Sequence, residues 1–241
     1  MKASSGAQMG KSFLVLFFKK ELLAVLLVLA ATPARANGDP LEVVNRAVHG
    51  FNVAAQRHVM GPAAAAYMAW TPRVVRAGLA GVVANLGEPV TAASALLAGE
   101  TALAATAAVR FGINSTLGLG GARDVAAGMG YPRASRGLSD ALCRWGVPRG
   151  PYLVLPLLGP TSLRDAAGMA ATSLALGHVV GADVVLAWGA GAGWVEYATV
   201  HAELAGLEAR ALDGYATLRS VYLQRRAWGC AVDRGEEEAS Q

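Results

Sequence analysis

The residues of this chain that could do catalytic chemistry are few and scattered. The four histidines lie in separate segments, at His49, His58, His178 and His201. The zinc motif HExxH, the nucleophile motif GxSxG and the phosphate loop GxxxxGK(S/T) do not occur. Residues 118–124, GLGGARD, lack the GxGxxG spacing and follow no expected strand, so a plain turn is favoured. The sequence therefore predicts no enzyme and no cofactor, and a Ser-His-Asp site assembled only by folding is the alternative.

The first 36 residues have the pattern of a secretory signal peptide. Lys11, Lys19 and Lys20 precede an apolar run at residues 22–31, and the small-residue cleavage pattern Ala34-Arg35-Ala36 follows. An uncleaved anchor is the alternative, but this run has only about half the length that a membrane-spanning helix needs. We therefore expect cleavage after Ala36 and export of the remaining chain.

The composition points to a membrane rather than to a nucleic acid. Of the 241 residues, 54% are hydrophobic and only 16% are charged, with a mean hydropathy of +0.38. The net charge of +4 comes from the leader, which holds all four lysines and Arg35 but only one acidic residue. Basic and acidic residues balance after residue 36, so no nucleic-acid partner is expected.

The two cysteines, Cys143 and Cys230, would face an oxidising compartment after export. One disulfide and two buried thiols are both compatible with this spacing. Neither cysteine has a histidine or another cysteine at zinc-ligand spacing, so no metal site is expected.

Hydrophobic residues at three- and four-residue steps predict an all-α fold with few strands. Asp39-Pro40 looks like a helix start, with aspartate as N-cap and proline at the first helical position. Thr71-Pro72 and Glu88-Pro89 repeat this pattern, so further helices are expected to begin there. Two helices should cover residues 89–110, with their joint near Gly99.

Turn-forming residues punctuate residues 112–160, where only short helices fit, at about 122–129 and 138–144. Thr161 or Ser162 should cap a helix that runs to about residue 176. Residues 184–195 should form a helix that is either buried or lies in a membrane. Asp213-Gly214 should divide the last helical region in two. The tail from residue 229 to 241 should be disordered.

The segment GPYLVLPLLGPTSLRD, residues 150–165, is apolar but carries Pro151, Pro156 and Pro160. Proline excludes a helix interior and a central strand, so this segment should be extended. It can line a channel or contact lipid with few free N–H groups, or it can pack across the helices as a buried crossover.

Five ordered blocks resemble the MlaA/VacJ family of outer-membrane lipid-asymmetry proteins. They are DPLEVVNRAVHGFN, YMAWTPRVVRAGLAGVVANLGEP, RFGINSTLGLGGARDVA, WGVPRGPYLVLPLLGPTSLRD and RSVYLQRR. The resemblance places an MlaA-like helical domain at residues 37–228. Family members are usually lipoproteins acylated on a cysteine at the cleavage site, whereas the first cysteine here is Cys143.

The resemblance implies a ring-like bundle of amphipathic helices around a central amphipathic channel, embedded in the outer membrane from its periplasmic face. Phospholipids misplaced in the outer leaflet would pass through this channel to a periplasmic lipid carrier of the MlaC type. The other implied partner is a trimeric porin of the outer membrane. Because the acylation cysteine is missing, the alternative is a periplasmic or peripheral adaptor that binds partners without translocating lipid.

The resemblance directs attention to the first helix and the proline-rich segment as lipid contacts. Phe51 and Asn52 lie where small shifts should alter lipid access, or they are a core phenylalanine beside a hydrogen-bonded asparagine. The proline-rich segment contributes the channel candidates Tyr152, Leu153, Val154, Leu155, Leu157 and Leu158.

Guanidinium groups are the candidates for binding the phosphate of a head group, because they can hold it bidentately. The candidates are Arg76, Arg110, Arg123 and Arg164. Each could instead form a structural ion pair, with Asp124 and Asp165 as nearby acids. Four asparagines are expected to cap helices or to bind buried backbone, namely Asn45, Asn52, Asn85 and Asn114.

Overall fold

The computed structural model describes residues 39–234, and side chains within it up to residue 230. The signal peptide expected at residues 1–36 lies outside the described residues. The elements, in chain order, are α2 (Glu42–Ala55), the π-helical turn η1 (Gln56–Met60), α3 (Gly61–Trp70), α4 (Arg73–Leu97), α5 (Thr101–Thr116), α6 (Val125–Gly128), α7 (Leu138–Arg144), β1 (Tyr152–Leu155), β2 (Gly159–Ser162), α8 (Leu163–Val180), α9 (Ala182–Arg210) and α10 (Gly214–Arg234).

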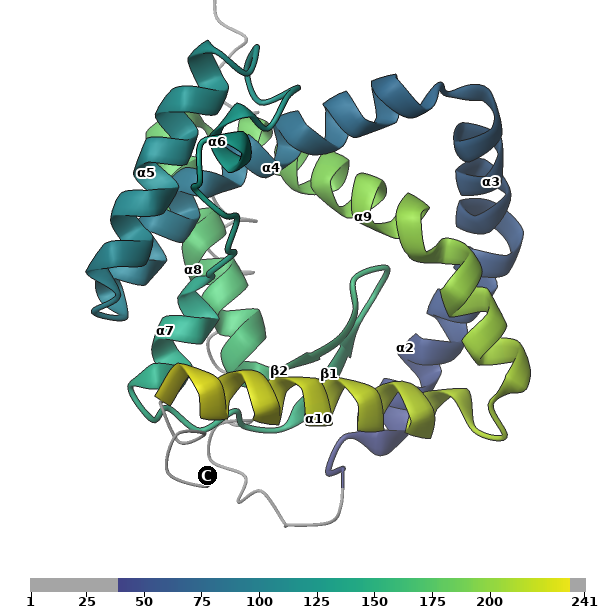
Figure 1. Cartoon of the computed structure of the whole chain (residues 1–241). Helices are drawn as coiled ribbons and strands as arrows, with labels where there is room; N and C mark the ends of the chain where they lie inside the picture. Colours follow the sequence, from purple (N-terminus) through teal and green to yellow (C-terminus); the bar gives the residue numbers. More distant parts are fainter. Residues whose placement is uncertain (1–38, 235–241) are drawn as a thin grey trace, which may run out of the picture.

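The helices follow the sides of a four-sided outline, and the hairpin of β1 and β2 projects between them (Figure 1). Helix α4 packs along α5, and α8 packs against α7 and α9. Helix α9 also contacts α3, while α10 closes one side by packing against α7 and β2. Elements far apart in sequence, such as α2 and β1, are thereby brought into contact.

Several expected boundaries are confirmed. The turn between α4 and α5 contains Gly99 at φ +77, and α7 occupies residues 138–144. The Ser162 hydroxyl caps α8 by accepting a hydrogen bond from the Asp165 amide. Helix α9 ends before Asp213-Gly214, where α10 begins.

The helix start expected at Asp39-Pro40 is wrong, because α2 begins at Glu42. Asp39 has a different task. Its carboxylate accepts hydrogen bonds from the Leu41 amide, the Asn45 side chain and the Tyr215 hydroxyl. It therefore ties the start of the described chain to α10 instead of capping the first turn.

The helix start expected at Glu88-Pro89 is also wrong, since α4 continues through Pro89 to Leu97. Proline removes one backbone hydrogen bond within a helix, and tertiary contacts must compensate. Here Glu88 is buried and its carboxylate accepts from the Arg110 guanidinium of α5 at 2.7 Å. This ion pair ties α4 to α5 at the residue next to the proline.

Two further expectations about chain ends are corrected. Helix α8 extends to Val180 rather than ending near residue 176. Helix α10 extends to Arg234, so the tail predicted to be disordered from residue 229 is helical over its first residues. Residues 235–241 lie outside the described part of the chain.

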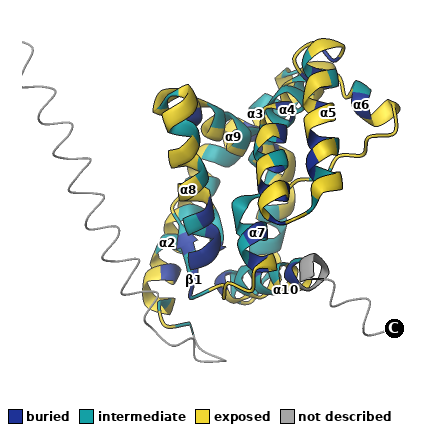
Figure 2. Cartoon of the chain, turned by 90° about the vertical axis from the view of Figure 1, so that its left-hand side faces the viewer, coloured by how far each residue is buried: buried dark blue, intermediate teal, exposed yellow. Residues whose placement is uncertain are grey.

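Helices α4 and α5 bury polar side chains and expose apolar ones. The buried residues of α4 are Asn85, Glu88, Thr91, Ser94 and Ala95, and those of α5 are Ala104, Ala107, Arg110 and Asn114. On the outside, Val74 is 83% exposed and Leu96 61%. Figure 2 shows how much of the helical surface is exposed. This arrangement is the reverse of a water-soluble bundle.

Within the described residues, α4 alone has both the length and the hydrophobicity for a membrane crossing. About a quarter of its most apolar window, 28%, is buried in the protein. Buried core helices can have the same length and hydrophobicity, so these two properties alone do not place α4 across a bilayer.

Candidate functional site

The proline-rich segment forms an antiparallel β-hairpin, so the all-α prediction is wrong at this point. Tyr152 pairs with Ser162 and Val154 with Pro160. A two-stranded sheet has no central strand, which is why Pro160 is tolerated within it. Leu157 adopts φ +63 at the turn, so the apolar tip of the hairpin is held by a left-handed residue.

Helix α2 binds the free edge of β1 through two asparagines that lie two helical turns apart. The Asn45 side chain donates to the Tyr152 carbonyl at 3.0 Å and accepts from the Val154 amide at 2.9 Å. The Asn52 side chain donates to the Leu155 carbonyl at 2.9 Å and accepts from the Leu157 amide at 2.7 Å. The two side-chain amides thus occupy backbone groups of β1 and of the turn that a third strand would otherwise bind.

The other two asparagines also bind backbone, as expected. Asn85 donates to the Gly120 carbonyl at 3.3 Å, and Asn114 accepts from the Ala126 amide at 3.0 Å. The first contact fixes the glycine-rich turn at residues 118–124 against α4, and the second fixes Ala126, just after this turn, against α5. This stretch is therefore a turn, as predicted from its spacing.

A cavity of about 330 Å³ lies between α2, the hairpin, α9 and α10. Five of the eight predicted channel residues are on its wall: Asn52, Tyr152, Val154, Leu157 and Leu158. The leucines of the hairpin tip are 56% and 64% exposed although they are apolar. The structure thus brings the first helix and the proline-rich segment together around one hollow.

The remaining three predicted residues do not line this cavity. Phe51 is 54% exposed on α2, and Leu153 and Leu155 are half-buried on β1. Alternation along the strand explains the last two, because successive side chains of β1 point to opposite faces.

The cavity wall is of mixed polarity. Polar side chains come from α2, η1 and α9, and include His49, Gln56, Glu196 and Tyr197. The α9 residues were not identified from the sequence, although Gly193, Glu196, Val200 and Leu204 follow a helical repeat. That repeat defines a face but does not say what it surrounds.

The arginines predicted to bind a head group are not brought together. The Arg110 guanidinium is buried and donates to Glu88, to Asp124 and to the carbonyl of Tyr131. Burial opposes its charge, but the hydrogen bonds with Asp124 and Glu88 outweigh burial and raise the pKa of Arg110. Its donors are used within the protein.

Arg164 is likewise buried, and it donates to the Val147 carbonyl, the Asp165 carboxylate and the Cys230 sulfur. Arg76 is half-buried and donates to the Thr71 carbonyl at 3.0 Å. Arg123 is exposed in the loop before α6. The role predicted for these four residues stays a prediction, and the contacts of Arg110 and Arg164 do not favour it.

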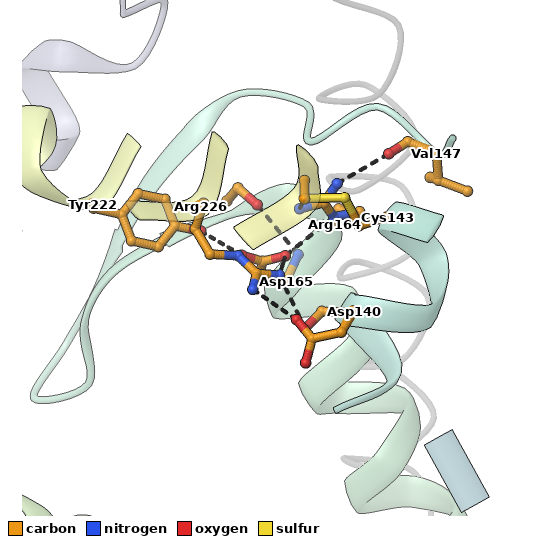
Figure 3. Close-up of a disulfide and its surroundings, with 10 residues drawn as sticks. Asp140, Cys143, Val147, Arg164, Asp165, Tyr222 and Arg226 are labelled. Carbon is orange, nitrogen blue, oxygen red and sulfur yellow. Dashed lines mark hydrogen bonds and ion pairs between the residues drawn. A yellow bond between two sulfur atoms is a disulfide. The ribbon is translucent and has the colours of Figure 1, made fainter. Parts of the chain in front are cut away.

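A disulfide joins Cys143 of α7 to Cys230 of α10, which resolves the two possibilities left open by the sequence (Figure 3). Next to it, Arg226 forms ion pairs with Asp140 and Asp165, both at 2.7 Å. The Tyr222 hydroxyl donates to Asp165 at 2.6 Å. The cluster fixes α10 to α7 and to the first turn of α8.

The buried Tyr222 predicts a pH dependence of stability. Burial, and then the hydrogen bond to Asp165, raise the pKa of Tyr222 from 10.0 to about 12. A raised folded-state pKa means that this contribution is complete below pH 10.0 and is lost as the pH rises towards about 12. The free energy of unfolding should therefore fall by up to about 1.4 kcal/mol per pH unit over this window.

Urea titrations of the wild type and of Tyr222→Phe between about pH 9 and about pH 12 will measure this loss. The variant should show a weaker decline, because it has no phenol at position 222 to ionise. Tyr131→Phe, at an exposed position, is the matched control. Equal slopes for wild type and Tyr222→Phe would contradict the assignment.

The model of the MlaA lipoprotein family matches residues 37–228. The chain belongs to this family. Curated MlaA proteins include the intermembrane phospholipid transport system lipoprotein MlaA of Escherichia coli strain K12. It is 32% identical over 209 residues, which cover 81% of this chain and 80% of that protein. Such MlaA proteins are named as transport components, not as enzymes.

Other relatives match over a shorter length. An uncharacterized protein of Rickettsia felis is 37% identical over 138 residues, or 57% of this chain, so the chain matches about half, 55%, of that relative. A solved structure described as "Structural basis for maintenance of bacterial outer membrane lipid asymmetry" is similar with a TM-score of 0.71. It is 29% identical and covers 80% of this chain and 100% of the solved chain.

Proposed function

We propose that this chain is an outer-membrane component that withdraws misplaced phospholipids from the outer leaflet and passes them to a periplasmic lipid carrier. The observation that carries this proposal is the cavity between α2, the hairpin, α9 and α10 in a chain of the MlaA family. In the proposal the helices form a ring, and this cavity is part of a channel through it. A trimeric porin is the proposed partner in the membrane.

The mixed polarity of the cavity suits a phospholipid. Exposing both acyl chains to water costs on the order of 25 kcal/mol at ~0.8 kcal/mol per methylene. Leu157 and Leu158 offer an apolar contact for such chains, while Glu196 and Asn52 provide polar atoms for a head group. No covalent chemistry is needed for this transfer.

The exposed apolar surface supports attachment to the periplasmic face of the outer membrane. Trp70 is 85% exposed and Leu186 73%, and α4 and α5 have their polar faces inward. Both cysteines of the chain are in the disulfide, so neither can carry an acyl group. We therefore propose that helical faces and protein partners, rather than a lipid on cysteine, hold the protein at the membrane.

Lipid extraction from the purified chain tests the proposal. The wild type should retain phospholipid, and Leu157→Asp with Leu158→Asp should retain much less, because two carboxylates would line the apolar tip. Leu212→Asp, at a fully exposed position outside the cavity, is the matched control. In cells, deletion should raise phospholipid in the outer leaflet.

The alternative hypothesis, an adaptor that binds partners without translocating lipid, predicts a different result. An adaptor on the same scaffold should contain no bound phospholipid and should wash off membranes with carbonate. A channel component should need detergent for release. Absence of lipid together with release by carbonate would overturn the proposed function.

A further inference from the structure

A second cavity, separate from the hairpin, lies between α4, the loop at residues 133–137 and α9, with a volume of about 570 Å³. This volume is in the range of ligand sites. Its apolar wall comes from both helices and includes Val83, Val90, Trp188 and Val195. Its polar wall includes Glu88, Thr91, Arg133, Ser135 and Glu196.

Glu88 is the group that marks this cavity as a binding site. The side chain is 3% exposed, and its Oε1 accepts from Arg110 at 2.7 Å. Its Oε2 is buried and has no hydrogen-bond partner within the described residues. A buried carboxylate oxygen without a donor is costly, so a ligand that brings an N–H donor would be stabilised there.

The charges around Glu88 determine which charge the donor group of the ligand should carry. The single guanidinium of Arg110 pairs with two carboxylates, Glu88 and Asp124 at 3.0 Å. One cation against two anions leaves a net negative charge beside the cavity, and Glu196 adds a second carboxylate on its wall. A ligand group that binds Oε2 of Glu88 should therefore carry both an N–H donor and a positive charge.

An anion-binding group lies on the same wall. Arg133 is exposed, lines the cavity and has no ion pair within the described part of the chain. A guanidinium that lines the same cavity as two carboxylates suits a ligand whose phosphate and ammonium groups are joined by a short linker. Glu196 also lines the hairpin cavity, so the two cavities share a wall residue.

From this arrangement we propose that the second cavity binds the head group of an amine-bearing glycerophospholipid, with its primary ammonium between Glu88 and Glu196 and its phosphate at Arg133. The inference rests on the proposed function and gives it a head-group preference. A primary ammonium has N–H donors for Oε2 of Glu88. A trimethylammonium group has none, and a glycerol head group has no positive charge, so phosphatidylethanolamine should be preferred over phosphatidylcholine and phosphatidylglycerol.

The test uses the full chain, freed of lipid in detergent and then incubated with mixed micelles of these three phospholipids in equal amounts. Bound lipid is quantified by mass spectrometry. The wild type should favour phosphatidylethanolamine by about tenfold, the effect of one charge-assisted hydrogen bond. Glu196→Gln, at an exposed position, and Arg133→Gln should reduce that ratio, whereas Glu203→Gln on the same helix but outside the cavity should not.

Glu88→Gln keeps an oxygen for Arg110 and should also lower the ratio if the variant folds. Should it fail to fold, Glu196→Gln and Arg133→Gln still decide the question. Equal binding of the three lipids by the wild type, or an unchanged ratio in both of these variants, overturns the inference while lipid binding itself survives. Failure to bind any of the three lipids overturns the proposed function as well.

Discussion

Arg110→Met is expected to lower the free energy of unfolding by about 3–5 kcal/mol. The guanidinium of Arg110 is 3% exposed and holds two carboxylates, from Glu88 in α4 and Asp124 before α6. Methionine fills a similar length but leaves Glu88 buried without a counter-charge. An uncompensated buried charge costs far more than the intact pair contributes.

Urea unfolding in one fixed detergent measures this loss through the shift of the midpoint at constant slope. Arg123→Met is the matched control, because Arg123 is exposed and its loss should cost less than about 0.5 kcal/mol. In the double variant Glu88→Gln with Arg110→Met, part of the loss should return, since the buried charge is gone. A cost for Arg110→Met as small as that of Arg123→Met would mean that Glu88 does not depend on Arg110.

Sequence reasoning located the helices well where a local signal ends them. Gly99 allows the left-handed turn after α4, and the Ser162 hydroxyl caps α8, so both boundaries could be predicted from single residues. The signal failed at Pro89, where α4 continues and the neighbouring Glu88 is buried in an ion pair with Arg110 of α5. That contact joins residues 22 positions apart and leaves no local trace.

The candidate site could be predicted in part for the same reason. Three prolines in an apolar stretch excluded a helix and led to the segment that forms the hairpin. The partners of that hairpin come from α2 and α9, and only the folded chain shows that Asn45 binds its edge and Glu196 faces its cavity. The four arginines illustrate the opposite case, since their chemistry suited phosphate but Arg110 and Arg164 are engaged inside the protein.

The inward polar faces of α4 and α5 could not be read from periodicity either. A helical repeat shows that Val75 and Leu79 share a face, yet it does not say whether that face meets a core or a lipid. In the structure these side chains are 48% and 46% exposed, while Asn85 and Asn114 are buried. Whether water or lipid surrounds the protein determines which helix face is buried, and the sequence does not state directly which of the two it is.

Removal of the disulfide should be the second large effect. Cys143→Ser with Cys230→Ser is expected to lower the free energy of unfolding by about 2–4 kcal/mol, because the bond closes a long loop in the unfolded chain. That loop spans a sequence separation of 87 residues and includes the hairpin, α8 and α9. The ion pairs of Arg226 with Asp140 and Asp165 persist in the variant, so α10 should remain docked.

Urea titrations of the wild type with and without a phosphine reductant, and of the double serine variant, measure this effect in three matched samples. Reduced wild type and the double variant should unfold at a similar midpoint, below that of the oxidised wild type. Reductant should leave the double variant unchanged, because it has no disulfide to lose. If the oxidised wild type and the double variant had the same midpoint, the bond between α7 and α10 would not constrain the chain, and the ion pairs of Arg226 alone would account for the docking of α10.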